Sequence, residues 1–136
     1  MSIYFFNSMV KSPSEKWNNS IIKYKKKCQS ILQLSNNIRY VGVINDYGRT
    51  LTGIIKPKIT PLMKSSIIKN ELFIISTLMT LRKESTSVVG KLDFVLLQHD
   101  KISILIFQEK SVTYYVTIDR KEKNIDKIKT SIKKLI

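Results

Sequence analysis

The chain has only one cysteine, one histidine, four glycines and three prolines in 136 residues. A lone cysteine, Cys28, excludes an internal disulfide framework and a zinc site built from cysteines. Few glycines and prolines and a hydrophobic content of 43% exclude long disordered tracts. No hydrophobic run reaches the length of a membrane span, and the segment Ile3–Phe6 is too short for a signal-peptide core. The sequence therefore predicts a single domain over residues 1–136 with a cytoplasmic location.

Residues that could carry chemistry are also scarce. His99 is expected at the end of a strand beside a turn, where an exposed histidine is common. Cys28 falls on the hydrophobic stripe of a helix, where a small buried residue is expected. The acidic residues Asp93, Asp100 and Glu109 follow no pattern that would bring two carboxylates together, and the four glycines form no phosphate-binding loop. The sequence predicts a protein without enzymatic activity, metal or cofactor.

Acidic residues are few, so the chain has a net charge of +14. Residues 1–37 hold six Lys and one Glu, a net +5, and residues 120–136 hold seven Lys or Arg and two acids, again +5. Such a field favours a polyanion or an acidic protein partner, but a lysine-rich surface can also serve only for solvation. The predicted basic surface consists of Lys23, Lys25, Lys26, Lys27, Lys127, Lys129, Lys133 and Lys134.

The chain begins with an N-terminal segment, 1–11, and a basic amphipathic helix, 12–34. The start of this helix shows a cap, a proline at the first turn and a capping-box glutamate in Ser12-Pro13-Ser14-Glu15. One hydrophobic stripe follows at helical spacing: Trp17, Ile21, Tyr24, Cys28 and Ile31.

The segment Ile38–Ile55 reads as two strands around a turn at Asn45–Gly48, in which Gly48 takes a left-handed conformation. Gly42 and Gly53 are expected to face each other, or nearly so, across the two strands. A glycine within a strand marks close approach of another group, and we expect that group to be a packed helix rather than a ligand.

A long helix is predicted over Ser65–Glu84 after a proline-containing loop, and it has two hydrophobic stripes where one is enough to cover a sheet. Three strands follow, over Leu92–His99, Ile102–Gln108 and Ser111–Asp119. The middle one is hydrophobic on both sides, so both faces of the sheet need cover. A short helix with the stripe Ile125, Ile128, Ile132 and Leu135 ends the chain.

The resulting order, α-β-β-α-β-β-β-α, predicts an α/β (α+β) fold with a five-stranded antiparallel sheet. The long helix lies on one face, and the two terminal helices share the other. This order resembles the roadblock family of dynein light-chain-like proteins, within the profilin-like and longin-like folds. The hairpin Ile38–Ile55, with Gly48, resembles roadblock sequences most, and it also resembles short archaeal proteins of unknown function. The long first helix and the high basicity depart from typical members.

The resemblance implies a non-catalytic homodimer that acts as a regulatory platform for a small Ras-like GTPase. An exposed second stripe on the long helix and an edge strand Leu92–His99 would both be covered in such a dimer. The alternatives are a basic nucleic-acid-associated protein and a small-ligand sensor. The predicted dimer interface comprises Ile67, Phe73, Ile74, Leu78, Leu81, Phe94 and Leu96.

Overall fold

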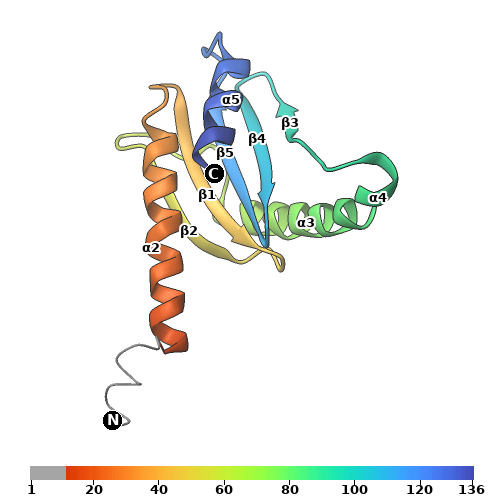
Figure 1. The fold of residues 1–136 in the computed structure, drawn as a ribbon. Coiled ribbons are helices and arrows are strands. Elements are labelled where there is room, and N and C mark those ends of the chain that lie inside the picture. Colours follow the sequence, from red (N-terminus) through yellow and green to blue (C-terminus); the bar gives the residue numbers. More distant parts are fainter. Residues whose placement is uncertain (1–11) are drawn as a thin grey trace, which may run out of the picture.

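In the computed structural model, residues 12–136 are described, and they form a twisted sheet with helices on both of its faces (Figure 1). The strands lie in the order β2-β1-β5-β4-β3, and every neighbouring pair is antiparallel. This confirms the predicted α+β class and the five-stranded sheet. The elements are α2 (Pro13–Leu32), β1 (Ile38–Asn45), β2 (Thr50–Ile55), α3 (Ser65–Glu84), α4 (Thr86–Val89), β3 (Val95–Gln98), β4 (Ile102–Glu109), β5 (Val112–Asp119) and α5 (Ile125–Leu135).

Helix α2 begins at the predicted capping box. The Ser12 hydroxyl accepts from the Glu15 amide at 3.2 Å, and the Glu15 carboxylate accepts from the Ser12 amide at 3.3 Å. Of the predicted stripe, only Cys28 and Ile31 are buried, whereas Trp17 is 56% exposed. The amino-terminal half of α2 extends past the sheet (Figure 1), so this half of the stripe has no sheet to cover.

The hairpin turn follows its predicted geometry. Gly48 has φ = 79°, its amide donates to the Asn45 carbonyl at 3.0 Å, and the Asn45 side chain accepts from the Tyr47 and Arg49 amides. Gly42 pairs directly with Gly53, as predicted. The expectation that a helix packs on this pair is wrong. The side chain of Tyr40, from the same sheet, occupies that space, because its hydroxyl is the atom nearest to where either glycine would carry a Cβ.

Two hydrophobic cores lie on opposite faces of the sheet, as the two-sided pattern of β4 predicts. On one face, α2 and α5 pack through Cys28, Ile31, Ile128 and Ile132 against Leu105 and other sheet residues. On the other face, α3 packs through Leu72, Ile75 and Met79 against the three isoleucines of β4 at positions 102, 104 and 106. The two terminal helices therefore share a face, and the long helix covers the other.

The bounds of α3 agree with the prediction, but the segment that follows does not. A short helix, α4, was not predicted, and Gly90 ends it with φ = 88°. Strand β3 spans Val95–Gln98 and is shorter than the predicted Leu92–His99, although it lies at the sheet edge as expected. The segment Ile3–Phe6 lies outside the described residues. Within residues 12–136, no helix is long and hydrophobic enough to cross a membrane.

Candidate functional site

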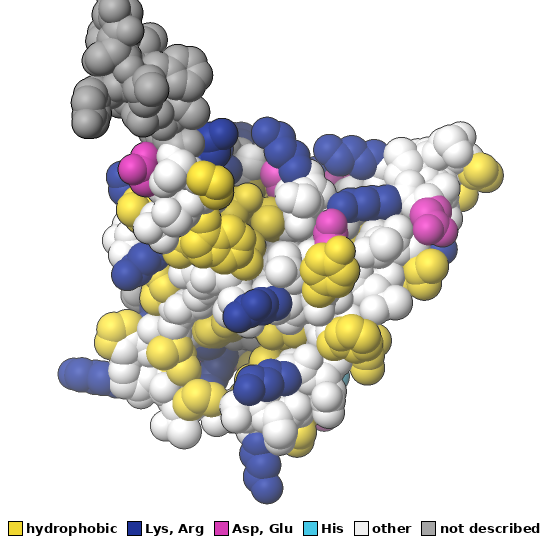
Figure 2. Space-filling view, turned by 90° about the horizontal axis from the view of Figure 1, so that it is seen from below, with side chains coloured by type: hydrophobic (Ala, Val, Ile, Leu, Met, Phe, Trp, Pro, Cys, Tyr) yellow, Lys and Arg dark blue, Asp and Glu magenta, His cyan; other side chains and the backbone are white. Residues whose placement is uncertain are grey.

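The surface of α3 that faces away from the sheet carries a row of exposed hydrophobic side chains. Its exposed side chains are 42% to 65% accessible to solvent, and we call them the outer α3 stripe: Ile67, Phe73, Ile74, Leu78 and Leu81. Figure 2 views the molecule from below, the side on which α3 lies in Figure 1, and shows hydrophobic and cationic side chains interspersed there with few acidic ones. Large exposed hydrophobic areas mark interaction sites on soluble proteins. Five of the seven residues predicted for a dimer interface thus lie together on one helix.

The other two predicted interface residues lie elsewhere. Phe94 is half-buried against Phe107 on the face that α2 and α5 cover, and the Lys129 ammonium lies 4.5 Å from the centre of its ring. Leu96 pairs with Leu105, which belongs to that same core, whereas Leu97 pairs with Ile104 on the α3 face. Because side chains alternate along a strand, Val95 and Leu97 are the residues of β3 on the α3 side, and of these two Leu97 is the exposed one. Strict alternation along 94–97 was the signal that could have identified it.

The hairpin turn holds α3 in place without covering the outer stripe. A Cβ on Gly48 would lie only 2.6 Å from the Cα of Phe73, so the turn backbone rests directly on the helix backbone. The Lys83 ammonium lies 3.4 Å from the Asp46 carboxylate at the far end of the helix. The Phe73 side chain is nevertheless 60% exposed. The stripe is therefore presented on a helix fixed by its inner face and by its backbone.

The predicted basic surface divides into two groups. Lys129 pairs with Asp126 at 3.7 Å, and Lys133 pairs with Asp93, so these two are engaged within the domain. Within the described residues the other six form no ion pair: Lys23, Lys25, Lys26, Lys27, Lys127 and Lys134. Since α2 and α5 pack on one face of the sheet, the fold brings both terminal clusters of charge to that side.

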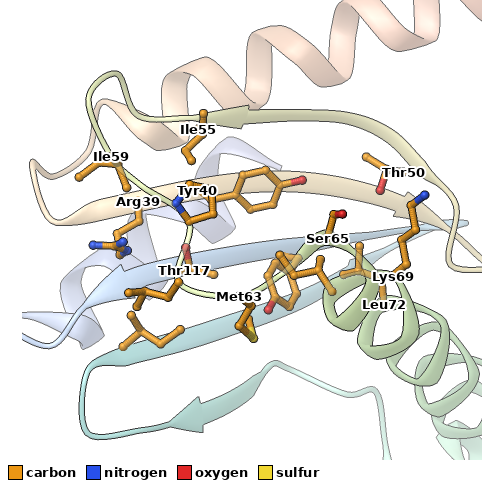
Figure 3. Close-up of a pocket in the computed structure, with 15 residues that line it drawn as sticks. Arg39, Tyr40, Thr50, Ile55, Ile59, Met63, Ser65, Lys69, Leu72 and Thr117 are labelled. Carbon is orange, nitrogen blue, oxygen red and sulfur yellow. The ribbon is translucent and has the colours of Figure 1, made fainter.

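A cavity of about 260 Å³ lies on the α3 face, between the sheet, the start of α3 and the loop 56–64. Tyr40, Tyr115 and Thr117 line it from the sheet, Ile68 and Leu72 from the helix, and further hydrophobic side chains from the loop (Figure 3). The sequence predicted only a proline-containing loop here. No local pattern revealed the cavity, because it depends on how that loop is held over the sheet.

His99 and Cys28 both have the surroundings predicted from the sequence. His99 is exposed, as predicted. Cys28 is fully buried, also as predicted, and burial raises the pKa of its thiol to about 12, so it is not a ready nucleophile. Among residues 12–136, no three His, Cys, Asp or Glu side chains lie close enough to hold a metal ion. The surface of residues 12–136 offers hydrophobic contact area, positive charge and an apolar cavity.

No protein-family model and no curated protein matches the sequence. Solved structures do match the fold. The gliding protein MglB from Thermus thermophilus superposes with a TM-score of 0.67 at 10% identity, over 85% of this chain and 84% of that one. MglB with a tetrameric arrangement superposes with a TM-score of 0.66 at 10% identity, over 93% of this chain and 87% of that one. A roadblock/LC7 domain from Streptomyces avermitilis superposes with a TM-score of 0.61 at 10% identity, over 81% of this chain and 88% of that one. The chain therefore has the roadblock fold that its element order resembled.

Proposed function

We propose that this chain is a non-catalytic regulatory module that forms a homodimer through the outer α3 stripe and binds a small Ras-like GTPase. The observation that carries the proposal is the outer stripe itself. A helix that covered one face of a sheet and had no other role would expose polar residues on its outer side. Here the inner side of the helix is hydrophobic and buried, and the outer side exposes five large hydrophobic residues as well.

A second copy of the chain fits this surface. The exposed side chains of Val88 and Val89 on α4 and of Leu97 on the edge strand β3 add to the hydrophobic area that follows α3 in the chain. A two-fold contact would let the stripe meet its own copy and would allow edge strands to pair. Such a dimer would bury on the order of 1,600 Å² in total, the size of a specific complex. One solved structure with this fold, an MglB, has a tetrameric arrangement.

The GTPase partner rests on the resemblance to roadblock domains and on charge. Roadblock-like domains commonly serve as platforms for small GTPases, and this chain, with a net charge of +14, favours an acidic partner surface. The free lysines of α2 and α5 lie on the face opposite α3, so a dimer through α3 would leave them accessible.

The test is capture from a native lysate supplied with either GDP or a non-hydrolysable GTP analogue, with the immobilised chain as bait. We expect mass spectrometry to recover a small GTPase whose yield depends on the nucleotide. The Ile74→Glu/Leu78→Glu variant, which keeps the inner face of α3, separates the two parts of the proposal, since it should lose self-association. Recovery of no GTPase with either nucleotide would overturn the partner assignment, whereas a wild-type chain that stays monomeric would overturn the dimer.

The nucleic-acid alternative has one supporting observation, the free lysines of α2. Base stacking needs exposed aromatic rings on a sheet face. Phe107 and Tyr114 are buried, and Tyr40 and Phe94 are half-buried within the two cores. Nucleic acid could therefore contact this surface through phosphates rather than through bases, which is a weaker basis for a dedicated function.

A further inference from the structure

We propose that the cavity beneath the loop 56–64 is a binding site for a small amphiphilic anion, with a short alkyl body and a carboxylate. The cavity has a volume of about 260 Å³ and opens to solvent where Thr50, Leu62 and Lys69 are exposed. The volume is just below the usual range of ligand pockets, roughly 300 to 1,000 Å³.

Specific contacts fix the position of the loop 56–64 beside the sheet. The Arg39 guanidinium donates to the Thr60 carbonyl at 2.9 Å and lies 3.8 Å from the Asp119 carboxylate. The Lys56 amide donates to the Arg39 carbonyl at 2.9 Å. Pro57 and Pro61 stiffen the same segment. Arg39 thus ties the loop to β1 beside the cavity, and its charge is already balanced by Asp119.

The second cation at the cavity, Lys69, has no such partner. It forms no ion pair with any residue of 12–136, and no carboxylate lines the cavity. Figure 3 draws Lys69 and Thr50 toward one end of the cavity and Arg39 and Ile59 toward the other. Lys69, with the hydroxyl groups of Thr50 and Ser65, can therefore bind a carboxylate at its own end.

The rest of the lining suits an alkyl chain. Ile68 and Leu72 of α3, Ile102 of β4, and Ile59 and Met63 of the loop give aliphatic walls. The volume corresponds to that of roughly nine water molecules at about 30 Å³ each, so the ligand has about ten non-hydrogen atoms. Octanoate has this size and charge and serves as the probe. A ligand so small binds in the micromolar to low-millimolar range.

The experiment is a titration of the full ¹⁵N-labelled chain with octanoate, followed by amide chemical shifts. We expect saturable shifts that cluster at the cavity, around Tyr40, Ile68 and Thr117. Octanol, which has the same chain length without the charge, should bind at least tenfold more weakly. Lys69→Met should weaken octanoate at least tenfold and leave octanol unchanged. Lys64→Met is the matched control, since Lys64 is exposed just before α3 and does not line the cavity.

Thr117→Ile places extra carbon atoms in the cavity and should weaken both probes, with folding verified by circular dichroism. The Ile74→Glu/Leu78→Glu variant should still bind octanoate, because the outer α3 stripe does not line the cavity. The proposal would be overturned by the absence of saturable shifts, by shifts confined to the outer α3 stripe, by equal affinity for octanol, or by an unchanged octanoate affinity in Lys69→Met.

Discussion

The hydroxyl of Tyr40 lies where a side chain at Gly53 would have to be: a Cβ built on Gly53 would be 2.3 Å from it. Gly42, paired with Gly53 across the hairpin, is covered by the same ring. The ring also packs edge-on against Tyr115, with 6.3 Å between the ring centres, and it lines the apolar cavity. The two glycines therefore make room for one aromatic side chain, which in turn shapes one wall of the cavity.

Gly53→Ala should lower the free energy of unfolding by about 1–3 kcal/mol, because overpacking forces the Tyr40 ring out of its position. In a Tyr40→Leu background the clash disappears. The same substitution should then be neutral, or stabilising by about 0.5 kcal/mol, since glycine is unfavourable within a strand. Urea denaturation of the wild type, the two single variants and the double variant gives the coupling energy between positions 40 and 53. An equal cost of Gly53→Ala in both backgrounds would show that Tyr40 is not the reason for the glycine.

Ile74→Glu/Leu78→Glu should convert the proposed dimer into a folded monomer, because charged side chains would be buried without partners in the contact. Sedimentation equilibrium at micromolar concentration measures the change. The matched control is Trp17→Glu/Ile22→Glu, which also replaces two exposed hydrophobic residues by glutamate, but on α2. It should leave the dimer intact. A variant in α3 that still dimerises would place the interface elsewhere on the molecule.

Any binding of nucleic acid should be limited to phosphate contacts. We expect no preference for base sequence. On double-stranded DNA, the logarithm of the binding constant should fall linearly with the logarithm of the salt concentration, with a slope of about −0.9 for each contacted phosphate. Replacing Lys25, Lys26 and Lys27 by Glu should abolish it and leave the fold intact, because these side chains form no ion pair within the described residues. Electrophoretic shifts at low salt are the measurement, and no shift there removes this alternative.

The stability of the protein should fall in alkaline solution partly through Cys28. Burial raises the pKa of this thiol from 9.0 to about 12, so the unfolded chain loses the proton at a lower pH than the folded one. The stabilisation is fully present below about pH 9 and is lost as pH rises toward 12, by about 1.4 kcal/mol for each pH unit. Burial raises the pKa of Tyr40, Tyr114 and Tyr115 in the same direction.

Cys28→Ala isolates the contribution of the thiol. Its free energy of unfolding should decline less between about pH 8 and pH 10 than that of the wild type, because the variant lacks the thiol. The tyrosines remain in both proteins, so their contribution to the decline is the same. Denaturant titrations at several pH values measure the two profiles. Parallel profiles would mean that the thiol does not titrate differently in the folded and unfolded states.

Local patterns in the sequence determined the elements and their layers. The capping box at Ser12 and Glu15, the left-handed turn at Gly48 and the period-two alternation along Val112–Asp119 each depend on neighbouring residues alone. The spacing of hydrophobic residues along α3 likewise indicates two stripes, one more than a single sheet face can cover. From these features followed the order of the elements, the covered faces and most of the candidate interface.

Contacts between segments distant in the chain decided the rest. The strand register assigned Leu97 to the α3 face and turned Phe94 and Leu96 to the other, because a shift of one residue reverses every side chain. The hydrogen bond from Arg39 to Thr60 joins the loop to β1 beside the cavity. The Tyr40 ring explains why positions 42 and 53 are both glycine, because it occupies the space that a side chain would need there. Alternation along 94–97 shows which side chains share a face, but only the pairing with β4 shows which face that is, and the Arg39–Thr60 and Tyr40–Gly53 contacts join residues that are distant in the sequence.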